Sequence, residues 1–335
     1  MLENSILNEE LIKKIVLDNY GLNVNEVKHL DRGSANIYIL DNKYVLKEFN
    51  QDREVDKILK EYNVISHLAK KGLRVPEYVL TKDNECYLMY ENHIIIIQLF
   101  LEGYTIENNT GEEYHINESA VVLGKLSKAL EDFEVDNKEY KFDSKEDLEE
   151  SIGKLKKLID SINEDNPYKE RFINDLNKKI EICEKLMEFD FNELYKVTLK
   201  VCHGDYSVQQ LIYNEELGTA VIDFETIRYM PIDWEIIRSY SYVDKECVDG
   251  EFNLDTFVNY VKTVKEYINL TKEDLKYMSY IYILQLVGST FGYKQYNSDY
   301  TKTGLLNFAL FRTNLCAYLY DNLDVISERL LELDK

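Results

Sequence analysis

Two aspartates near the middle of the chain have neighbours and a spacing that could serve one reaction. Asp205 closes the tripeptide His203-Gly204-Asp205, and Asp223 follows at the end of a predicted hairpin whose strands cover 210–213 and 219–224. Because a hairpin returns the chain close to its starting point, we expect the two carboxylates to face one cavity. Phosphoryl transfer uses such a pair: one carboxylate orients the acceptor hydroxyl, and the other binds magnesium that bridges the nucleotide phosphates.

The composition allows a large folded core and argues against some partners. The chain has 335 residues, of which 45% are hydrophobic, so it can form one large domain or two lobes. Its 62 acidic and 40 basic side chains give a net charge of -22. This charge disfavours binding to nucleic acid or to anionic membranes and permits a cationic partner.

Neither the cysteines nor the first residues suggest export. The five cysteines are odd in number, widely spaced and without a C-x-x-C pair, so neither a disulfide framework nor a zinc site is predicted. The first residues are acidic and have helical periodicity, where a secretory peptide needs a basic start and an apolar block. No apolar run approaches the roughly 18 residues of a membrane span, so we expect a cytoplasmic location.

The spacing of apolar residues changes along the chain and predicts two lobes. A helix over 5–19 precedes a small antiparallel sheet with one internal helix; the strands are predicted at 27–31, 35–41, 44–49, 86–90 and 93–99, and the helix at 53–71. Helices then dominate, at 116–133, 145–164, 168–188, 254–267, 271–287 and 305–331, interrupted by the strand-rich segment 201–224. The predicted division is a sheet lobe over 1–97, a connector over 98–103 and a helical lobe over 104–335.

The motif at 203–224 resembles that of the aminoglycoside phosphotransferase and choline kinase family, H-G-D-x-x-x-x-N followed by I-D-F or I-D-W. The resemblance implies an α+β, protein-kinase-like fold, with a small antiparallel sheet lobe that binds nucleotide and a large, mainly helical lobe. It implies a small-molecule kinase that transfers the γ-phosphoryl group of ATP or GTP to a hydroxyl. On this interpretation Asp205 is the catalytic residue, Asp223 binds magnesium and His203 orders the loop.

Two positions depart from familiar kinase patterns. Gln210 stands where the family has its asparagine, and its longer side chain loses more rotamer entropy when it holds a metal. Its carbonyl oxygen can still bind a hard cation such as magnesium, so Gln210 and Asp223 are the predicted metal ligands. Glu225 follows Asp223-Phe224 where protein kinases have glycine, which argues for a small acceptor over a protein.

The resemblance also implies a nucleotide site in the first lobe. Lys47, in the middle of a predicted strand, would contact the phosphates and pair with Glu61 of the following helix, with Glu54 as the alternative partner. A buried lysine needs such a partner because an unpaired ammonium is costly to desolvate. The loop with Gly33 and Ser34 would cover the phosphates through its backbone.

Other segments gain roles from the same resemblance. The backbone of the connector, at Gln98 and Phe100, would meet the nucleotide base. Asp233 matches an aspartate that anchors the catalytic loop or caps the next helix. The acidic cluster at 244–251 would contact an amine-bearing acceptor such as an aminoglycoside or an amino-alcohol, although such a cluster is also typical of a solvated loop.

A second interpretation is a protein of the same fold that has little or no kinase activity. The two-lobed chain with its 27 tyrosines also resembles kinase-like spore-coat proteins, so it could be a weakly active or inactive binding protein. The glutamine at position 210 favours this alternative slightly. Stabilisation by magnesium and nucleotide would separate the two interpretations, because a ligand that binds the folded state raises its stability.

Overall fold

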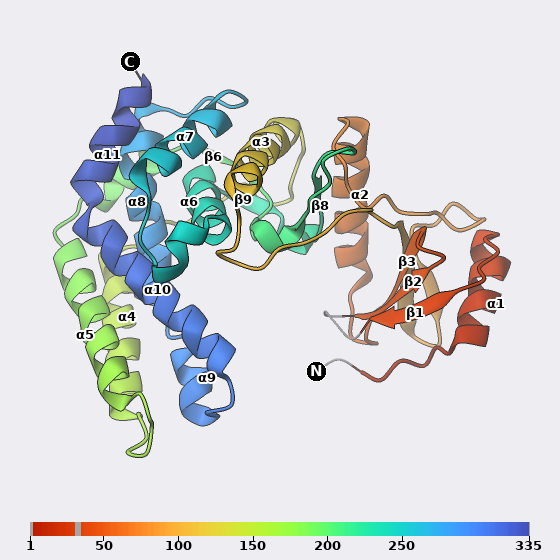
Figure 1. Ribbon diagram of the computed structural model, residues 1–335, viewed down its shortest axis with the longest axis horizontal. Helices are drawn as coiled ribbons and strands as arrows, with labels where there is room; N and C mark the ends of the chain where they lie inside the picture. The colour runs from red at the N-terminus through yellow and green to blue at the C-terminus, as the bar shows by residue number, and fades with distance from the viewer. Residues whose placement is uncertain (1–2, 31–34, 335) are drawn as a thin grey trace. The chain divides into compact units, whose positions relative to one another are not determined.

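The computed structural model describes residues 3–30 and 35–334, and the chain divides into two compact units (Figure 1). The first unit comprises Met1–Thr105 and Gln210–Ile227, and the second comprises Ile106–Gln209 and Arg228–Lys335. The predicted connector at 98–103 lies close to the first boundary. The difference from the predicted division is the segment 210–227, which packs with the first unit and not with the helical part.

Backbone hydrogen bonds explain why this later segment belongs to the first unit. The Tyr104 N–H donates to the Tyr213 carbonyl at 3.0 Å, and the Tyr213 N–H donates back at 2.9 Å. The Val221 N–H donates to the Arg74 carbonyl at 3.0 Å, and the Arg74 guanidinium donates to the Gly218 carbonyl at 2.8 Å. These hydrogen bonds join residues that are distant in sequence, so they cannot be predicted from composition or from the periodicity of apolar residues.

The first unit contains a five-stranded antiparallel sheet in the order β1-β2-β3-β5-β4. Its strands are β1 (Val27–Leu30), β2 (Asn36–Leu40), β3 (Tyr44–Glu48), β4 (Leu88–Tyr90) and β5 (His93–Leu99). Asp41 and Asn42 join β2 to β3 with φ values of 50° and 49°, as a tight hairpin with matching twist requires. The small antiparallel sheet predicted from the sequence is confirmed.

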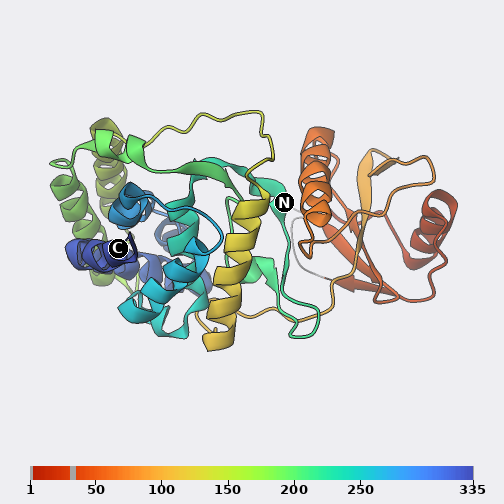
Figure 2. The same ribbon diagram turned by 90° about the horizontal axis from the view of Figure 1, so that it is seen from above.

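The two helices of the first unit cover opposite faces of the sheet (Figures 1 and 2). α1 (Glu9–Tyr20) packs with Ile95 and Ile97 of β5, whereas α2 (Val55–Lys70) packs with the alternate residues Ile94 and Ile96. Successive side chains of a strand point to opposite faces. The run of isoleucines in β5 is therefore buried on both sides, which is why it lacks the alternation of a half-exposed strand.

A short hairpin completes the first unit and carries the segment 210–227. β7 (Leu211–Ile212) pairs with β8 (Ala220–Val221), flanked by the 3₁₀ helices Val208–Gln210 and Phe224–Thr226. The hairpin and its loop were predicted correctly, but the strands are shorter than 210–213 and 219–224. The two 3₁₀ helices lie at the outer ends of the predicted strands. The second strand cannot extend to residue 224, because Asp223 has a left-handed backbone conformation.

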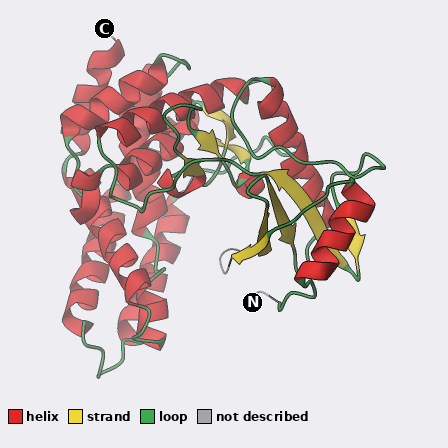
Figure 3. Cartoon of the chain, turned by 45° about the vertical axis from the view of Figure 1, so that its right-hand side comes forward, coloured by secondary structure: helices red, strands yellow, loops and turns green. Residues whose placement is uncertain are grey.

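The second unit is mainly helical (Figure 3). Its helices are α3 (Glu113–Ala129), α4 (Lys145–Asp160), α5 (Lys169–Leu186), α6 (Ile232–Val243), α7 (Leu254–Lys265), α8 (Lys272–Val287), α9 (Tyr293–Ser298), α10 (Thr303–Asp321) and α11 (Leu323–Leu331). The single helix predicted over 305–331 is wrong. The backbone leaves the helical region at Asn322, with φ -115° and ψ 16°, and α11 begins at the next residue, Leu323. Apolar periodicity alone misses such a break.

A two-stranded ribbon in this unit connects the Asp205 loop to α6. β6 (Leu199–Cys202) pairs antiparallel with β9 (Arg228–Pro231). The loop with His203-Gly204-Asp205 leaves the end of β6, and α6 begins directly after β9. Because Cys202 pairs with Arg228 and Leu199 pairs with Pro231, the loop and α6 leave the ribbon at opposite ends. α6 packs back along β6 and β9, and its side chains reach the loop from there.

A buried lysine donates hydrogen bonds at the C-terminal end of α8. The Lys179 ammonium, on α5, donates to the carbonyls of Leu286 at 3.1 Å and Ser289 at 2.8 Å. These acceptors lie at the carbonyl end of α8, where the helix dipole favours a cation. Burial nevertheless lowers the pKa of Lys179 to about 8.

We expect the wild type to gain stability over Lys179→Met as the pH rises from about 8 to about 10. The folded-state pKa is depressed, so the unfolded chain binds more protons in this window, and stability therefore rises with pH by up to about 3 kcal/mol. Urea unfolding at several pH values measures the difference. Lys178→Met, at a half-buried neighbour on the same helix, is the control; a constant difference between wild type and Lys179→Met would contradict the expectation.

Candidate functional site

The loop that carries Asp205 is anchored by a buried carboxylate of α6. Glu235 is 1% exposed and accepts hydrogen bonds from the backbone N–H groups of His203, at 3.2 Å, and Gly204, at 2.5 Å. Gly204 has a φ of 83°, a conformation that a residue with a side chain adopts only with strain. Glu235 thus holds the turn that places Asp205.

Burial and these hydrogen bonds act on Glu235 in opposite directions. Desolvation raises the pKa of Glu235 to about 7, although the two N–H donors oppose the shift. Accepting two backbone N–H groups favours the ionised carboxylate, since both bonds strengthen with its charge. The loop amides therefore offset part of the electrostatic cost of burying Glu235, and desolvation remains the larger effect.

Asp233 does not have the anchoring role that the sequence predicted. Its carboxylate is fully buried and accepts no hydrogen bond within residues 3–30 and 35–334, and it does not cap α6. Burial, with the nearby charge of Asp274, raises its pKa well above the usual range. The anchor lies two residues later, at Glu235, because only that side chain points from α6 to the loop amides.

A second α6 side chain contacts Asp205 directly. The Arg238 guanidinium donates through Nη2 to Oδ1 of Asp205. It also donates through Nη1 to the Tyr242 hydroxyl at 3.2 Å, and it lies over the rings of Trp234 and Tyr242, with 5.3 Å and 4.6 Å to their centroids. Arg238 was not among the residues predicted from the sequence; its spacing of three residues from Glu235 on one helix was the available signal.

His203 is a packing residue of the same loop. It is fully buried, and its ring meets the edge of Tyr206 at a centroid distance of 6.1 Å. The Tyr206 hydroxyl donates to the Ser119 carbonyl on α3 at 2.8 Å. These contacts pack His203 within the loop, and the loop-ordering hydrogen bond expected of its side chain stays a prediction.

The two predicted metal ligands are neighbours within the first unit. The Ile222 N–H donates to the Gln210 carbonyl at 3.0 Å, which places Gln210 beside the segment that ends in Asp223. Asp223 has φ 67° and ψ 65°, a left-handed conformation that costs energy in a residue other than glycine. Such an outlier is typical of a site where the backbone aims a side chain.

The donor set fits magnesium held jointly with a nucleotide. Gln210 and Asp223 offer an amide oxygen and a carboxylate, and magnesium is usually bound by one or two carboxylates, with phosphates and water as the remaining ligands. In the part of the chain that the structure describes, no group of three or more His, Cys, Asp or Glu side chains could hold a metal alone. Asp205 belongs to the other unit, so the cavity shared by Asp205 and Asp223 stays a prediction.

Lys47 lies where predicted, in the middle of β3, opposite Ile37 and Ile96. Its predicted partner Glu61 is 2% exposed on α2 and accepts a hydrogen bond from the Tyr78 hydroxyl at 3.0 Å. Within the described ranges the structure records no ion pair between Lys47 and Glu61. Glu54, the alternative, pairs with Lys57 at 2.9 Å. Tyr78 therefore holds the carboxylate that Lys47 was expected to hold.

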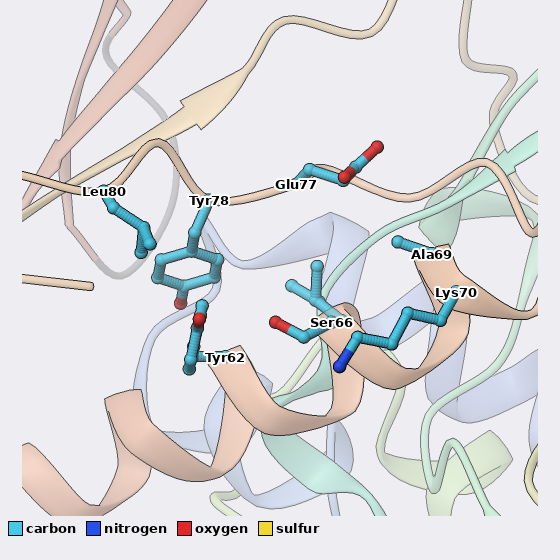
Figure 4. Close-up of a pocket in the computed structure, with 8 residues that line it drawn as sticks. Tyr62, Ser66, Ala69, Lys70, Glu77, Tyr78 and Leu80 are labelled. Atoms are coloured by element: carbon cyan, nitrogen blue, oxygen red, sulfur yellow. The ribbon is translucent and has the colours of Figure 1, made fainter. Parts of the chain in front are cut away.

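A pocket of about 360 Å³ opens beside this tyrosine (Figure 4). It is lined by α2 and the segment 77–80; the lining residues include Tyr62, Ser66, Lys70, Glu77, Tyr78 and Leu80. None of these was predicted as a site residue. Its connection to the candidate site is Tyr78, whose hydroxyl contacts Glu61.

The connector residues are tied into the sheet. Gln98 is 1% exposed and pairs with Val45. The Phe100 N–H donates to the Lys43 carbonyl at 2.9 Å. This N–H group was expected to donate to a nucleotide base, but it already has an acceptor in the backbone. Gly33 and Ser34, predicted to cover the phosphates, lie outside the described residues.

Glu225 has a structural role that the sequence did not indicate. It accepts two hydrogen bonds from Arg53, at 3.2 Å and 2.7 Å, and Arg53 lies 4.8 Å from the ring centroid of Phe49. A bidentate arginine pair fixes both position and orientation. It holds the 3₁₀ turn after Asp223 against the beginning of α2.

The acidic cluster at 244–251 is partly used inside the second unit. Asp244 is 2% exposed and accepts from the Tyr240 hydroxyl at 2.8 Å and from the Glu246 N–H at 2.9 Å. Glu246 in turn accepts from the Asn253 amide at 2.9 Å. These carboxylates hold a turn together, which weakens the expectation that they bind an amine.

Among residues 3–30 and 35–334, none of the helices combines the length and the apolar character that a membrane span needs.

Comparison with known proteins agrees with this architecture. An aminoglycoside phosphotransferase from Alicyclobacillus acidocaldarius has 14% identity and a TM-score of 0.70, over 97% of this chain and 98% of its own. A spectinomycin phosphotransferase in complex with ADP and spectinomycin has 15% identity and a TM-score of 0.65, over 96% and 99%. The amicoumacin kinase hAmiN, in complex with AMP-PNP, Ca2+ and Ami, has 15% identity and a TM-score of 0.61, over 92% and 93%.

These identities establish the fold alone, and no curated protein matches the sequence. The model of the phosphotransferase enzyme family matches residues 26–258, which is more than half of the chain and includes both aspartates. The chain therefore belongs to the phosphotransferase enzyme family.

Proposed function

We propose that this protein is a small-molecule kinase of the cytoplasm that transfers the γ-phosphoryl group of ATP or GTP to a hydroxyl. The observation that carries the proposal is the loop of Asp205, whose amides are held by a buried carboxylate in a chain of the phosphotransferase family. An anchored carboxylate is what this reaction needs from the protein, because most of the rate comes from positioning and charge.

The proposed roles follow the two units. In the second unit, Asp205 orients the acceptor hydroxyl and receives its proton as the new oxygen–phosphorus bond forms and the bond to the nucleoside diphosphate leaving group breaks. In the first unit, Asp223 and Gln210 would hold magnesium, and Lys47 would contact the phosphates. When bound, magnesium would neutralise charge on the nucleotide phosphates. The proposed nucleotide-binding role therefore falls to the first unit, which includes the connector at 98–103 and the segment 210–227, and the catalytic role falls to the second unit.

The ligands bound in similar structures guide the choice of donor and acceptor. Those structures hold ADP, AMP-PNP or GDP, and some hold spectinomycin or kanamycin. We therefore propose a nucleotide donor and, as acceptor, an aminoglycoside, an amino-alcohol or a similar metabolite.

One observation favours a binding protein without strong activity as the second candidate. Glu61 accepts from Tyr78, and no ion pair with Lys47 is recorded within the described residues. A phosphate-contacting lysine that lacks its carboxylate partner would hold a nucleotide less well. This candidate is a kinase-like structural protein, such as a spore-coat protein.

Thermal unfolding with magnesium and nucleotide, followed by a transfer assay, tests the proposal. We expect ATP or GTP with magnesium to raise Tm, because a ligand of the folded state stabilises it. We also expect phosphorylation of at least one member of a panel of aminoglycosides, amino-alcohols and sugars. A shift in Tm without transfer to any acceptor would favour the binding protein, and the absence of both would contradict nucleotide-dependent function.

A further inference from the structure

We propose that Arg238 is a positioning residue for the reaction: its guanidinium holds the carboxylate of Asp205 in the orientation that meets the acceptor hydroxyl. The inference rests on the proposed role of Asp205. Both residues lie in the second unit, and the contact runs from Nη2 of the arginine to Oδ1 of the aspartate.

The burial of the two partners differs in a way that suits this role. The Arg238 side chain is 14% exposed, whereas the Asp205 side chain is 39% exposed. The guanidinium thus holds the carboxylate from the protein side, while the carboxylate remains accessible to a small molecule. A charge-assisted hydrogen bond of this kind is stronger and more directional than a neutral one.

Arg238 is itself held in place by aromatic side chains. It lies over Trp234 and Tyr242, and its Nη1 donates to the Tyr242 hydroxyl at 3.2 Å. A planar guanidinium can stack on rings and still donate in fixed directions, which an ammonium cannot do. The arginine is therefore a preorganised support, and its direction is set before any substrate binds.

The same helix holds the loop in two complementary ways. Glu235 and Arg238 are three residues apart on α6, so their side chains project from one face. Glu235 accepts from the loop backbone, and Arg238 donates to the side chain of Asp205. Together they fix both the position of the loop and the direction of its carboxylate.

An alternative role for the same contact predicts the opposite result. If Arg238 kept Asp205 away from the acceptor, removing it would free the base and raise kcat. If Arg238 orients Asp205, removing it lowers kcat, because misplacing a reacting group by about 1 Å can cost about 10²-fold in rate. The direction of the change in kcat separates the two roles.

The experiment compares Arg238→Ala, Arg238→Lys and Arg238→Met with the wild type, using an acceptor that the wild type phosphorylates. We expect kcat of Arg238→Ala to fall about 10²-fold with little change in KM for the nucleotide. We expect Arg238→Lys to recover part of the loss, and added guanidinium ion to raise kcat of Arg238→Ala. Rescue of kcat by guanidinium distinguishes positioning from a general loss of structure.

The controls keep the result decisive. Arg312→Met removes another arginine that stacks on a ring, Phe308 at 5.4 Å, and should leave kcat close to wild type. In an Asp205→Asn background, Arg238→Ala should cause little further loss, because both act through one group.

A kcat of Arg238→Ala equal to or above wild type overturns the inference while the proposed function stands. Loss of kcat that neither lysine nor guanidinium rescues, with unchanged Tm, also overturns it. Absence of transfer by the wild type refutes the proposed function instead. If Arg238→Ala fails to fold, kcat of Arg238→Met replaces it in the comparison: a value equal to or above wild type overturns the inference. A lower value that Arg238→Lys partly recovers supports it.

Discussion

Asp205→Asn is expected to lower kcat for phosphoryl transfer by about 10³-fold, within the range of about 10²- to 10⁴-fold that general-base residues contribute. The amide keeps the shape of the carboxylate and an oxygen that can accept from Arg238, but it cannot receive the proton of the acceptor hydroxyl. Asparagine is preferred to alanine, because alanine would also remove the oxygen at position 205 that accepts from the largely buried Arg238 guanidinium.

The measurement pairs turnover with nucleotide binding. We expect the Kd for ATP or GTP with magnesium to stay close to the wild-type value, since Asp205 lies in the second unit and the proposed nucleotide ligands lie in the first. Glu131→Gln, at a carboxylate of the second unit that pairs with Lys128 and Lys200, is a matched control for the removal of one charge. Turnover of Asp205→Asn close to wild type would refute Asp205 as the base.

Glu235→Ala is expected to lower both the free energy of unfolding and kcat. The backbone N–H groups of His203 and Gly204 would lose their acceptor inside the protein, at a cost of about 1 to 3 kcal/mol each. The total of about 2 to 6 kcal/mol is a large fraction of the stability of an ordinary domain. The loop would then hold Asp205 less firmly, so kcat should fall with KM for the nucleotide little changed.

Urea unfolding and transfer kinetics check this expectation, and Asp233→Asn is the matched control. Asp233 is also a fully buried carboxyl of α6, but its oxygens contact no loop amide in the described structure. We expect Asp233→Asn to leave kcat near wild type. If Asp233→Asn impaired turnover and Glu235→Ala did not, the original assignment of the anchor to Asp233 would be right.

Much of the architecture could be predicted because it depends on local patterns. Apolar spacing placed the strands of the first unit within a few residues, and β5 at its observed limits. The Asp41-Asn42 pair predicted the turn between β2 and β3, since these residues tolerate a positive φ. The motif at 203–224 led to the family that the matching family model now shows.

Other predictions failed because they require partners that are distant in sequence. The segment 210–227 belongs to the first unit through hydrogen bonds to Arg74 and Tyr104. Glu61 accepts from Tyr78, and Asp244 accepts from Tyr240. The family resemblance implied Lys47 as the partner of the first and, with a solvated loop as the alternative, an amine-bearing acceptor for the second. Each of these carboxylates is buried, and burial selects whichever donor the packing brings near.

The sequence by itself determined that Asp205 ends an H-G-D motif and that Asp223 follows a short hairpin, because residue type and local spacing are sufficient for both. Only the tertiary structure decided which side chains support Asp205. Asp233 and Glu235 are two residues apart on one helix and look equally suitable in the sequence, but a helix turns about 100° per residue, so they point in different directions. Glu235 and Arg238 face the loop, and that direction makes them its supports.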